Sequence, residues 1–137
     1  MEKSRRHNIL RGMAVAADLE ALRKSGKGYI LVGSKIAVLR DEAVQEGVII
    51  LSDNAKPKMF EGTIVAIGQA IRNNPEEYDA QGLEVGQRAT FSKYEGALHK
   101  VALSGGDSVE LEVMHINDLY FVWQGHDVPA DEESNDG

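Results

Sequence analysis

The chain has 137 residues, of which 42% are hydrophobic and 27% charged, a composition typical of one globular domain with a substantial core. The absence of cysteine excludes a disulfide framework, a thiol nucleophile and a cysteine-ligated metal. A formal net charge of −7 argues against a general nucleic-acid binder, and no apolar run approaches the roughly 20 residues of a membrane span.

Charge divides the chain into three segments. Residues 1–27 carry seven basic and three acidic side chains, residues 28–125 carry eight and fourteen, and residues 126–137 carry five acids and no base. We therefore predict a partly helical N-terminal extension over 1–28, one β domain over 29–125, and a disordered acidic tail over 126–137.

The first predicted element is a short helix in the N-terminal extension. Apolar residues recur there at helical spacing: Ile9, Met13, Ala16, Ala17, Leu19 and Leu22. Ser25-Gly26-Lys27-Gly28 ends it. The segment is either an accessory helix or an organelle transit peptide; Glu2, Asp18 and Glu20 are unusual in a transit peptide and favour the accessory helix.

From Tyr29 onward the pattern is that of short strands. We predict them over 29–40, 61–68, 86–94, 97–103, 108–116 and 118–123, with Gly33 as a bend or bulge in the first. Polar segments rich in turn-forming residues separate them, and no helix is expected between them. Many short strands with frequent turns indicate an antiparallel β-barrel or sandwich.

No set of residues with catalytic spacing emerges. The histidines His7, His99, His115 and His126 lie far apart without metal-ligand spacing, so His99 and His115 are expected to be solvated or hydrogen-bonded. Gly105-Gly106-Asp107-Ser108 superficially resembles the surroundings of a protease serine, but its place between two strands predicts a hairpin turn. No nucleotide-binding loop is present. We therefore predict that the chain is not an enzyme and needs no metal or cofactor.

One stretch, GVIILSDNAKPK (47–58), needs a separate interpretation. Four apolar residues from Val48 to Leu51 stand side by side without the alternation of a half-buried strand, and turn-forming residues follow at once. It is either a short core strand or an apolar segment that a partner covers.

This stretch and its continuation, GVIILSDNAKPKMFEGTIVAIG (47–68), resemble the chaperonin-10 family, the GroES-like co-chaperonins. LEVGQRATFSKYEG (83–96) is similar to a second block of the family, and LVGSKIAVLR (31–40) and INDLYFVW (116–123) are similar to its first and last strands. The resemblance covers about residues 29–123, and its middle block is the most specific part.

The resemblance implies an irregular Greek-key β-barrel that assembles as a heptameric dome. The dome would cap a large GroEL-like chaperonin ring in the cytoplasm and close its ATP-driven folding chamber, so unfolded clients are partners only indirectly. A mobile loop over about 41–60 would bind the chaperonin through Ile49, Ile50 and Leu51, with Gly47 and Val48 in support. Contacts between neighbouring subunits would involve the first and last strands, at Ile30, Val32, Ile36, Leu119, Phe121 and Trp123. A roof loop over the dome would contain Glu76, Glu77, Tyr78 and Asp79.

The chain departs from the family pattern in several ways. Val48 occupies a position where glycine is usual, which predicts a stiffer loop, and Ser52 replaces a frequent proline. The N-terminal extension and the acidic tail have no counterpart in the family. These additions favour a divergent member, and a viral origin is one hypothesis. The alternatives are a structural or assembly β-barrel without chaperonin binding, and a GroES-like enzyme domain, for which zinc ligands and a dinucleotide fold are missing.

Overall fold

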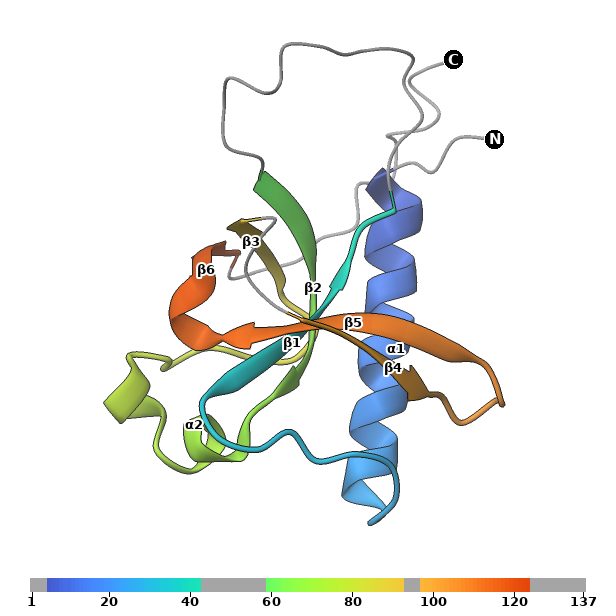
Figure 1. Cartoon of the computed structure of the whole chain (residues 1–137), viewed down its shortest axis with the longest axis horizontal. Coiled ribbons are helices and arrows are strands. Elements are labelled where there is room, and N and C mark those ends of the chain that lie inside the picture. The colour runs from blue at the N-terminus through green and yellow to red at the C-terminus, as the bar shows by residue number, and fades with distance from the viewer. Residues whose placement is uncertain (1–4, 43–58, 93–96, 124–137) are drawn as a thin grey trace, which may run out of the picture.

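The computed structural model describes residues 5–42, 59–92 and 97–123 (Figure 1). A long helix, α1 (Arg5–Lys24), comes first. The strands are β1 (Lys35–Arg40), β2 (Met59–Ile67), β3 (Arg88–Ser92), β4 (Ala97–Ala102), β5 (Ser108–His115) and β6 (Leu119–Val122). Short helical segments α2 (Gln69–Asn73) and η2 (Pro75–Tyr78) lie between β2 and β3, and η3 (Ile116–Asp118) joins β5 to β6. The predicted acidic tail, 126–137, lies outside the described residues.

The six strands form one antiparallel sheet in the order β4-β5-β1-β2-β3-β6. Irregular register between Ala37 and Val38, and again between Thr90 and Phe91, marks bulges that bend the strands. Within the described part of the chain, β4 and β6 are the two outer strands and do not pair with each other. The prediction of a mainly β antiparallel fold with an N-terminal helix is confirmed, whereas closure of the sheet into a barrel stays a prediction.

The first strand is shorter than predicted. It occupies only Lys35–Arg40, because residues before it form hydrogen bonds with the start of α2 and not with a neighbouring strand. The carbonyl groups of Leu31 and Gly33 accept hydrogen bonds from the N–H groups of Gln69 and Ala70, at 2.8 and 3.1 Å. Helix-starting N–H groups have no partner within their own helix and need such acceptors. Helix α2 also corrects the expectation that no helix separates the strands, while Gly33, with φ of 76°, does form the predicted bend.

Both faces of the sheet are covered, and β1 shows this most clearly. Its residues from Ile36 to Leu39 are all buried, although side chains alternate along a strand. Ile36 and Val38 join an inner cluster with Phe91 and Met114. Ala37 and Leu39 join a second cluster on the opposite face, together with side chains of α1. The run of apolar residues in β1 therefore reflects burial on two sides.

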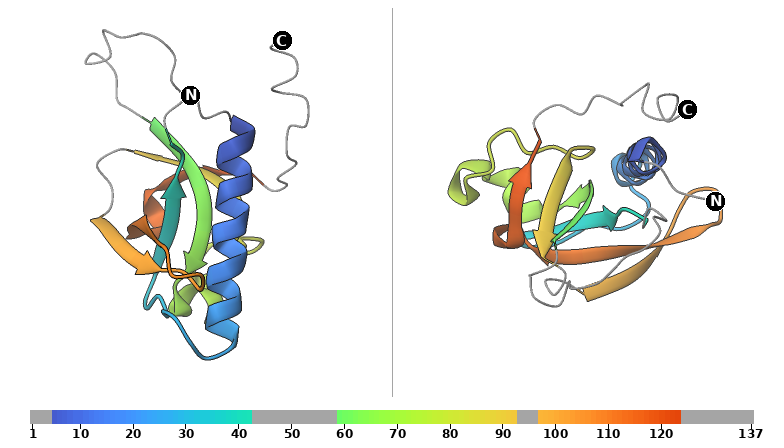
Figure 2. Two further views of the ribbon diagram at one scale, coloured as in Figure 1. Left: turned by 90° about the vertical axis from the view of Figure 1, so that its right-hand side faces the viewer. Right: turned by 90° about the horizontal axis from the view of Figure 1, so that it is seen from above.

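Helix α1 covers that second face and lies alongside β2 (Figure 2). Val15 and Ala16 are its buried contacts with the sheet. At Gly12 the helix approaches so closely that a Cβ atom would lie 2.0 Å from Thr63 Oγ1. The predicted helix is therefore present, but it is 20 residues long rather than short, and its inward face belongs to the hydrophobic core.

A buried acid lies on β5, beside the end of β1. The Glu112 side chain is 5% exposed, and its Oε1 atom lies 3.6 Å from the Arg40 guanidinium without a hydrogen-bond partner among the described residues. The Arg40 guanidinium also stacks over the Phe60 ring, at 4.3 Å from its centroid. Burial raises the pKa of Glu112, and the positive charge of Arg40 offsets this only in part. Its ionised form is therefore less favourable in the folded chain than in the unfolded chain.

Changing Glu112 to glutamine is expected to remove this pH-dependent cost while it keeps the side-chain shape. The carboxyl group binds its proton more tightly in the folded chain than in the unfolded chain, where the pKa is near 4.5. As pH rises above that value and through the folded-state pKa, the wild type should lose unfolding free energy relative to Glu112→Gln. Urea unfolding of both proteins at a series of pH values measures the difference. A difference that does not change with pH would contradict the assignment.

Candidate partner-binding and assembly surfaces

The residues predicted to bind a chaperonin, Gly47, Val48, Ile49, Ile50 and Leu51, lie outside the described residues. The structure does describe the chain on either side of residues 43–58. Strand β1 leads into this segment and β2 follows it; the two strands are paired, with Arg40 opposite Gly62. The Asp41 N–H also donates to the Glu61 carbonyl at 2.9 Å. The two strands are therefore paired up to Asp41 and Glu61, near the points where the segment begins and ends.

A buried arginine connects these two ends. The Arg88 side chain on β3 is 4% exposed and donates from its two terminal nitrogens to the two carboxylate oxygens of Asp41, at 2.8 Å for the Nη1–Oδ1 pair. It also donates to Thr63 Oγ1 at 2.9 Å and lies 3.7 Å from Glu61. A two-pronged arginine–carboxylate pair sets both position and orientation. Sequence reasoning missed Arg88, because its partner Asp41 is recognisable only once the strand order is known.

The predicted subunit-interface residues differ sharply in exposure. Leu119 is half-buried against the inner cluster. Ile36 has no exposed surface and belongs to the inner cluster of the chain's own core, and its part in a subunit contact stays a prediction. The other four predicted residues are exposed, by 57%, 63%, 69% and 40% respectively: Ile30, Val32, Phe121 and Trp123.

Most of the large exposed apolar side chains in the described part of the chain lie on two surfaces. One is the arm, residues 29–32, which borders an apolar groove of about 350 Å³ between the end of α1 and the sheet. The other is β6, the outer strand beside β3, where Tyr120 and Phe121 point away from the core. Large exposed apolar side chains that cluster in this way are typical of interaction sites. The arm and β6 are thus candidate assembly surfaces.

The predicted roof residues lie in a short helical segment and directly after it. Pro75–Tyr78 form the 3-10 helix η2, which Asp79 ends in the left-handed conformation at φ of 55°. Glu76 and Glu77 are exposed, while Tyr78 is half-buried against the inner cluster. This acidic segment projects from one side of the sheet beside α2 (Figure 1).

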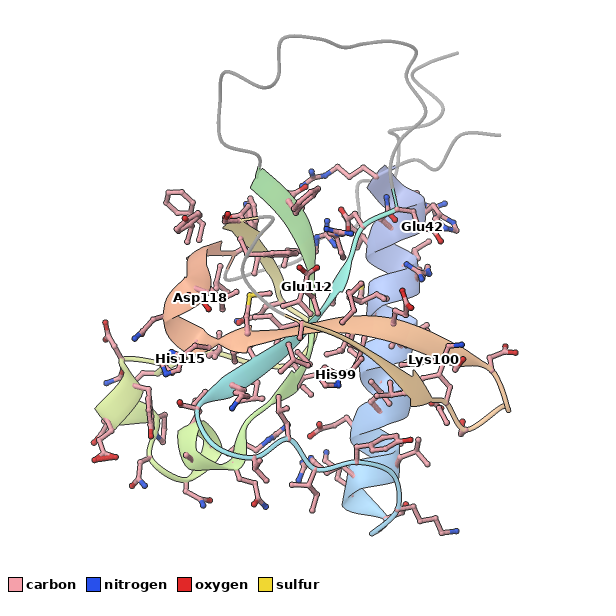
Figure 3. The ribbon with its side chains drawn as sticks, in the orientation of Figure 1. Glu42, His99, Lys100, Glu112, His115 and Asp118 are labelled. Atoms are coloured by element: carbon pink, nitrogen blue, oxygen red, sulfur yellow. The ribbon has the colours of Figure 1, made fainter. Side chains whose placement is uncertain are left out.

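Two histidines in the strands have the predicted environments. His99 is exposed on β4. His115 Nε2 lies 2.9 Å from Ser34 Oγ, and its Nδ1 accepts the N–H of Asn117 at 3.1 Å (Figure 3). The Asp118 carboxylate accepts the His115 N–H in return. The prediction that these histidines are solvated or hydrogen-bonded is confirmed.

The remaining features show no centre for catalysis in the described part of the chain. Gly105, Gly106 and Asp107 lie in the turn between β4 and β5, and Ser108 begins β5. The Leu103 N–H donates to the Asp107 carbonyl, so the predicted hairpin is confirmed. The described residues contain no group of three His, Cys, Asp or Glu side chains that could hold a metal ion. Of the helices that the structure describes, none is long and apolar enough to cross a membrane.

Comparison with known proteins defines the class. The family model described as Chaperonin 10 Kd subunit matches residues 27–131. The chain therefore belongs to the chaperonin-10 family, whose members are co-chaperonins of protein folding and not enzymes, as the sequence predicted. Helix α1 precedes the matched residues.

Three relatives show the extent of the similarity. Co-chaperonin GroES of Methylibium petroleiphilum is 36% identical over 84 residues, which cover 61% of this chain and 82% of that protein. Co-chaperonin GroES of Holospora obtusa is 35% identical over 91 residues, or 65% of this chain and 90% of that protein. Co-chaperonin GroES of Caulobacter vibrioides is 33% identical over 90 residues, or 64% and 88%.

Proposed function

We propose that this chain is a co-chaperonin that forms a heptameric cap on an ATP-driven, GroEL-like chaperonin ring and closes its folding chamber in the cytoplasm. The observation that carries the proposal is the family match, because it runs through residues 47–58 and the strands on either side of them. Client proteins would meet the cap only inside the closed chamber. The chain itself makes or breaks no bond.

Ile49, Ile50 and Leu51 are the proposed contact with the ring, with Gly47 and Val48 in support. Burying three such side chains in a groove, at roughly 1.5–3 kcal/mol each, would yield about 5–9 kcal/mol. Ordering each residue of the contacting segment costs ~1–2 kcal/mol, so one segment alone should bind weakly. Seven segments on one cap share an effective concentration, which converts weak contacts into firm but reversible capping. Reversibility is needed because the cap must leave in each ATP cycle of its partner.

The arm and β6 are the proposed contacts between neighbouring subunits. Pairing of the arm of one subunit with β6 of the next would cover the exposed side chains of Ile30, Val32, Phe121 and Trp123 and the outer edge of the sheet. The aromatic residues of β6 suit such a surface, since aromatic side chains are enriched in interface cores. The same arrangement is compatible with a sheet that closes into the family's barrel.

The acidic segment Glu76, Glu77, Tyr78 and Asp79 is the proposed roof of the dome. Its exposed carboxylates would repel one another if seven copies met closely around an axis. They are therefore expected to border an opening and not a sealed contact.

Ile50→Asp is expected to abolish ATP-dependent binding to a chaperonin ring, because it places a charge where an apolar groove must close. Asn54→Asp adds the same charge nearby and keeps the apolar triplet, so it is the matched control. Size-exclusion chromatography first gives the assembly state of each purified protein. Native mass spectrometry with the ring and ATP then measures how much of each protein is bound to the ring. Equal binding by Ile50→Asp and the wild type would contradict the proposed role of Ile49, Ile50 and Leu51. A stable monomer of about 15 kDa would contradict the heptamer.

A further inference from the structure

The first two turns of α1 contact Glu42, the last described residue before the segment 43–58. The Asn8 amide nitrogen donates to the Glu42 carbonyl at 3.1 Å, and the Glu42 N–H donates to Asn8 Oδ1 at 2.7 Å. The side chain of Asn8, itself 4% exposed, thus gives Glu42 the pair of hydrogen bonds that a neighbouring strand would give. Asn8 therefore fixes the backbone at Glu42, two residues beyond the end of β1.

Ionisable side chains of the same helix turns contact Glu42 and Glu61, which lie on either side of residues 43–58. The Glu42 carboxylate is 3.2 Å from His7 Nε2 and 3.7 Å from Arg11 Nε. On the other side, Arg5 Nη1 lies 3.4 Å from Glu61 Oε1 on β2. Exposed pairs of this kind contribute little to stability, but together they hold Glu42 and Glu61 close to the helix. Figure 3 shows Glu42 beside the N-terminal turns of α1.

These contacts are separate from the packing that docks α1. The helix is held against the sheet by Val15, Ala16 and the close approach at Gly12. A second polar connection lies nearer the C-terminal end, where the Asp18 carboxylate accepts hydrogen bonds from the N–H and the hydroxyl group of Ser104. The helix therefore has several polar connections to the body. One is at Glu42 and Glu61, on either side of residues 43–58, one is at the β4–β5 hairpin, and one joins Glu20 to Arg72, whose Nη2 donates to Glu20 Oε1 at 3.1 Å.

We propose that α1 is a positioning helix for the chaperonin-binding segment, and that Asn8 is its principal positioning residue. The inference rests on the proposed function. Holding both chain ends reduces the conformational freedom that binding must remove, so less of the contact energy is lost to ordering. Because α1 precedes the residues matched by the family, it adds this control to the family's binding segment.

The test compares Asn8→Ala with Asp18→Ala, each of which removes two hydrogen bonds between α1 and the body. The dissociation constant and dissociation rate are measured on an immobilised GroEL-like ring with ATP. Asn8→Ala is expected to weaken binding about tenfold through faster dissociation, since one lost hydrogen-bond pair is repeated in every subunit of the cap. Asp18→Ala should stay within about twofold of the wild type. Equal weakening by both variants would mean that α1 is only a structural support, and would overturn the proposal.

A second measurement needs no chaperonin. Amide hydrogen exchange at Glu42 should become faster in Asn8→Ala and remain unchanged in Asp18→Ala. Unchanged exchange in both variants would overturn the proposal, because the Asn8–Glu42 hydrogen bonds would then not restrain the backbone at Glu42. If exchange responds as expected but the wild type binds no ring, the proposed function fails and the helix connection stands. If the wild type binds and Asn8→Ala binds equally well despite faster exchange, the positioning role fails alone.

A reversible cross-link provides the rescue. The chain has no cysteine of its own, so Asn8→Cys combined with Glu42→Cys creates one possible disulfide. The reduced form is expected to bind the ring as weakly as Asn8→Ala, and the oxidised form to regain wild-type dissociation. Failure of the bond to form, or oxidised binding no tighter than reduced, would count against the proposal.

Discussion

Replacing Arg88 with methionine is expected to lower the free energy of unfolding by about 3–5 kcal/mol, the cost typical of breaking a buried ion pair on one side. Arg88 is the buried partner of the Asp41 carboxylate and also donates to Thr63 Oγ1. Methionine fills part of the volume but leaves Asp41, whose side chain is 18% exposed, without its counter-charge. Urea unfolding followed by tryptophan fluorescence measures the loss.

Arg5→Met is the matched control for this experiment. Arg5 contacts Glu61, which also lies near Arg88, but its side chain is 45% exposed. Loss of an exposed pair should change the unfolding free energy by less than about 1 kcal/mol. Equal effects of the two substitutions would show that Arg88 does not hold the ends of β1 and β2 together.

Replacing Gly12 with valine is expected to displace α1 from the sheet, at a cost of roughly 2–3 kcal/mol. A Cβ atom at position 12 would lie 2.0 Å from Thr63 Oγ1 and 2.5 Å from Thr63 Cβ, so the helix itself must move. Thr63 cannot yield easily, because it is fully buried and its hydroxyl group accepts from Arg88. Urea unfolding measures the cost, and hydrogen exchange over α1 reports the displacement.

Ala14→Val adds a branched side chain to an exposed position of the same helix. It should cost no more than about 0.7 kcal/mol, the range of helix propensities among ordinary residues. If Gly12→Val were no more destabilising than this control, the close approach of α1 to β2 would be contradicted.

Local sequence patterns predicted the strands well because strand signals are local. The predicted stretches 97–103 and 108–116 nearly coincide with β4 and β5, because the turn-forming residues Gly105, Gly106 and Asp107 mark the boundary between them. The first strand was overextended because its early residues bond to α2, a contact that no local pattern contains. Helical spacing likewise found the buried side of α1 at Ile9 and Ala16. It gave no sign of Gly12, whose role depends on Thr63 in another element.

The candidate site divides in the same way. The family resemblance predicted a binding segment at residues 47–51, whereas the side chains that hold Asp41 and Glu42, just before residues 43–58, come from distant parts of the chain. Asn8 and Glu42 are 34 residues apart, and Asp41 and Arg88 are 47 apart. The resemblance assigned Ile36 to a subunit contact, which stays a prediction. The strand pattern gave no sign that both faces of β1 are covered within the chain, because this depends on α1 and on distant strands.

The most direct test of the central claim is imaging of the purified wild-type chain mixed with a bacterial GroEL-like ring, with and without ATP. The account predicts a ring with one end closed by a dome when ATP is present, and an open ring without nucleotide. Rings that remain open in ATP, at concentrations where the chain itself is assembled, would contradict the account.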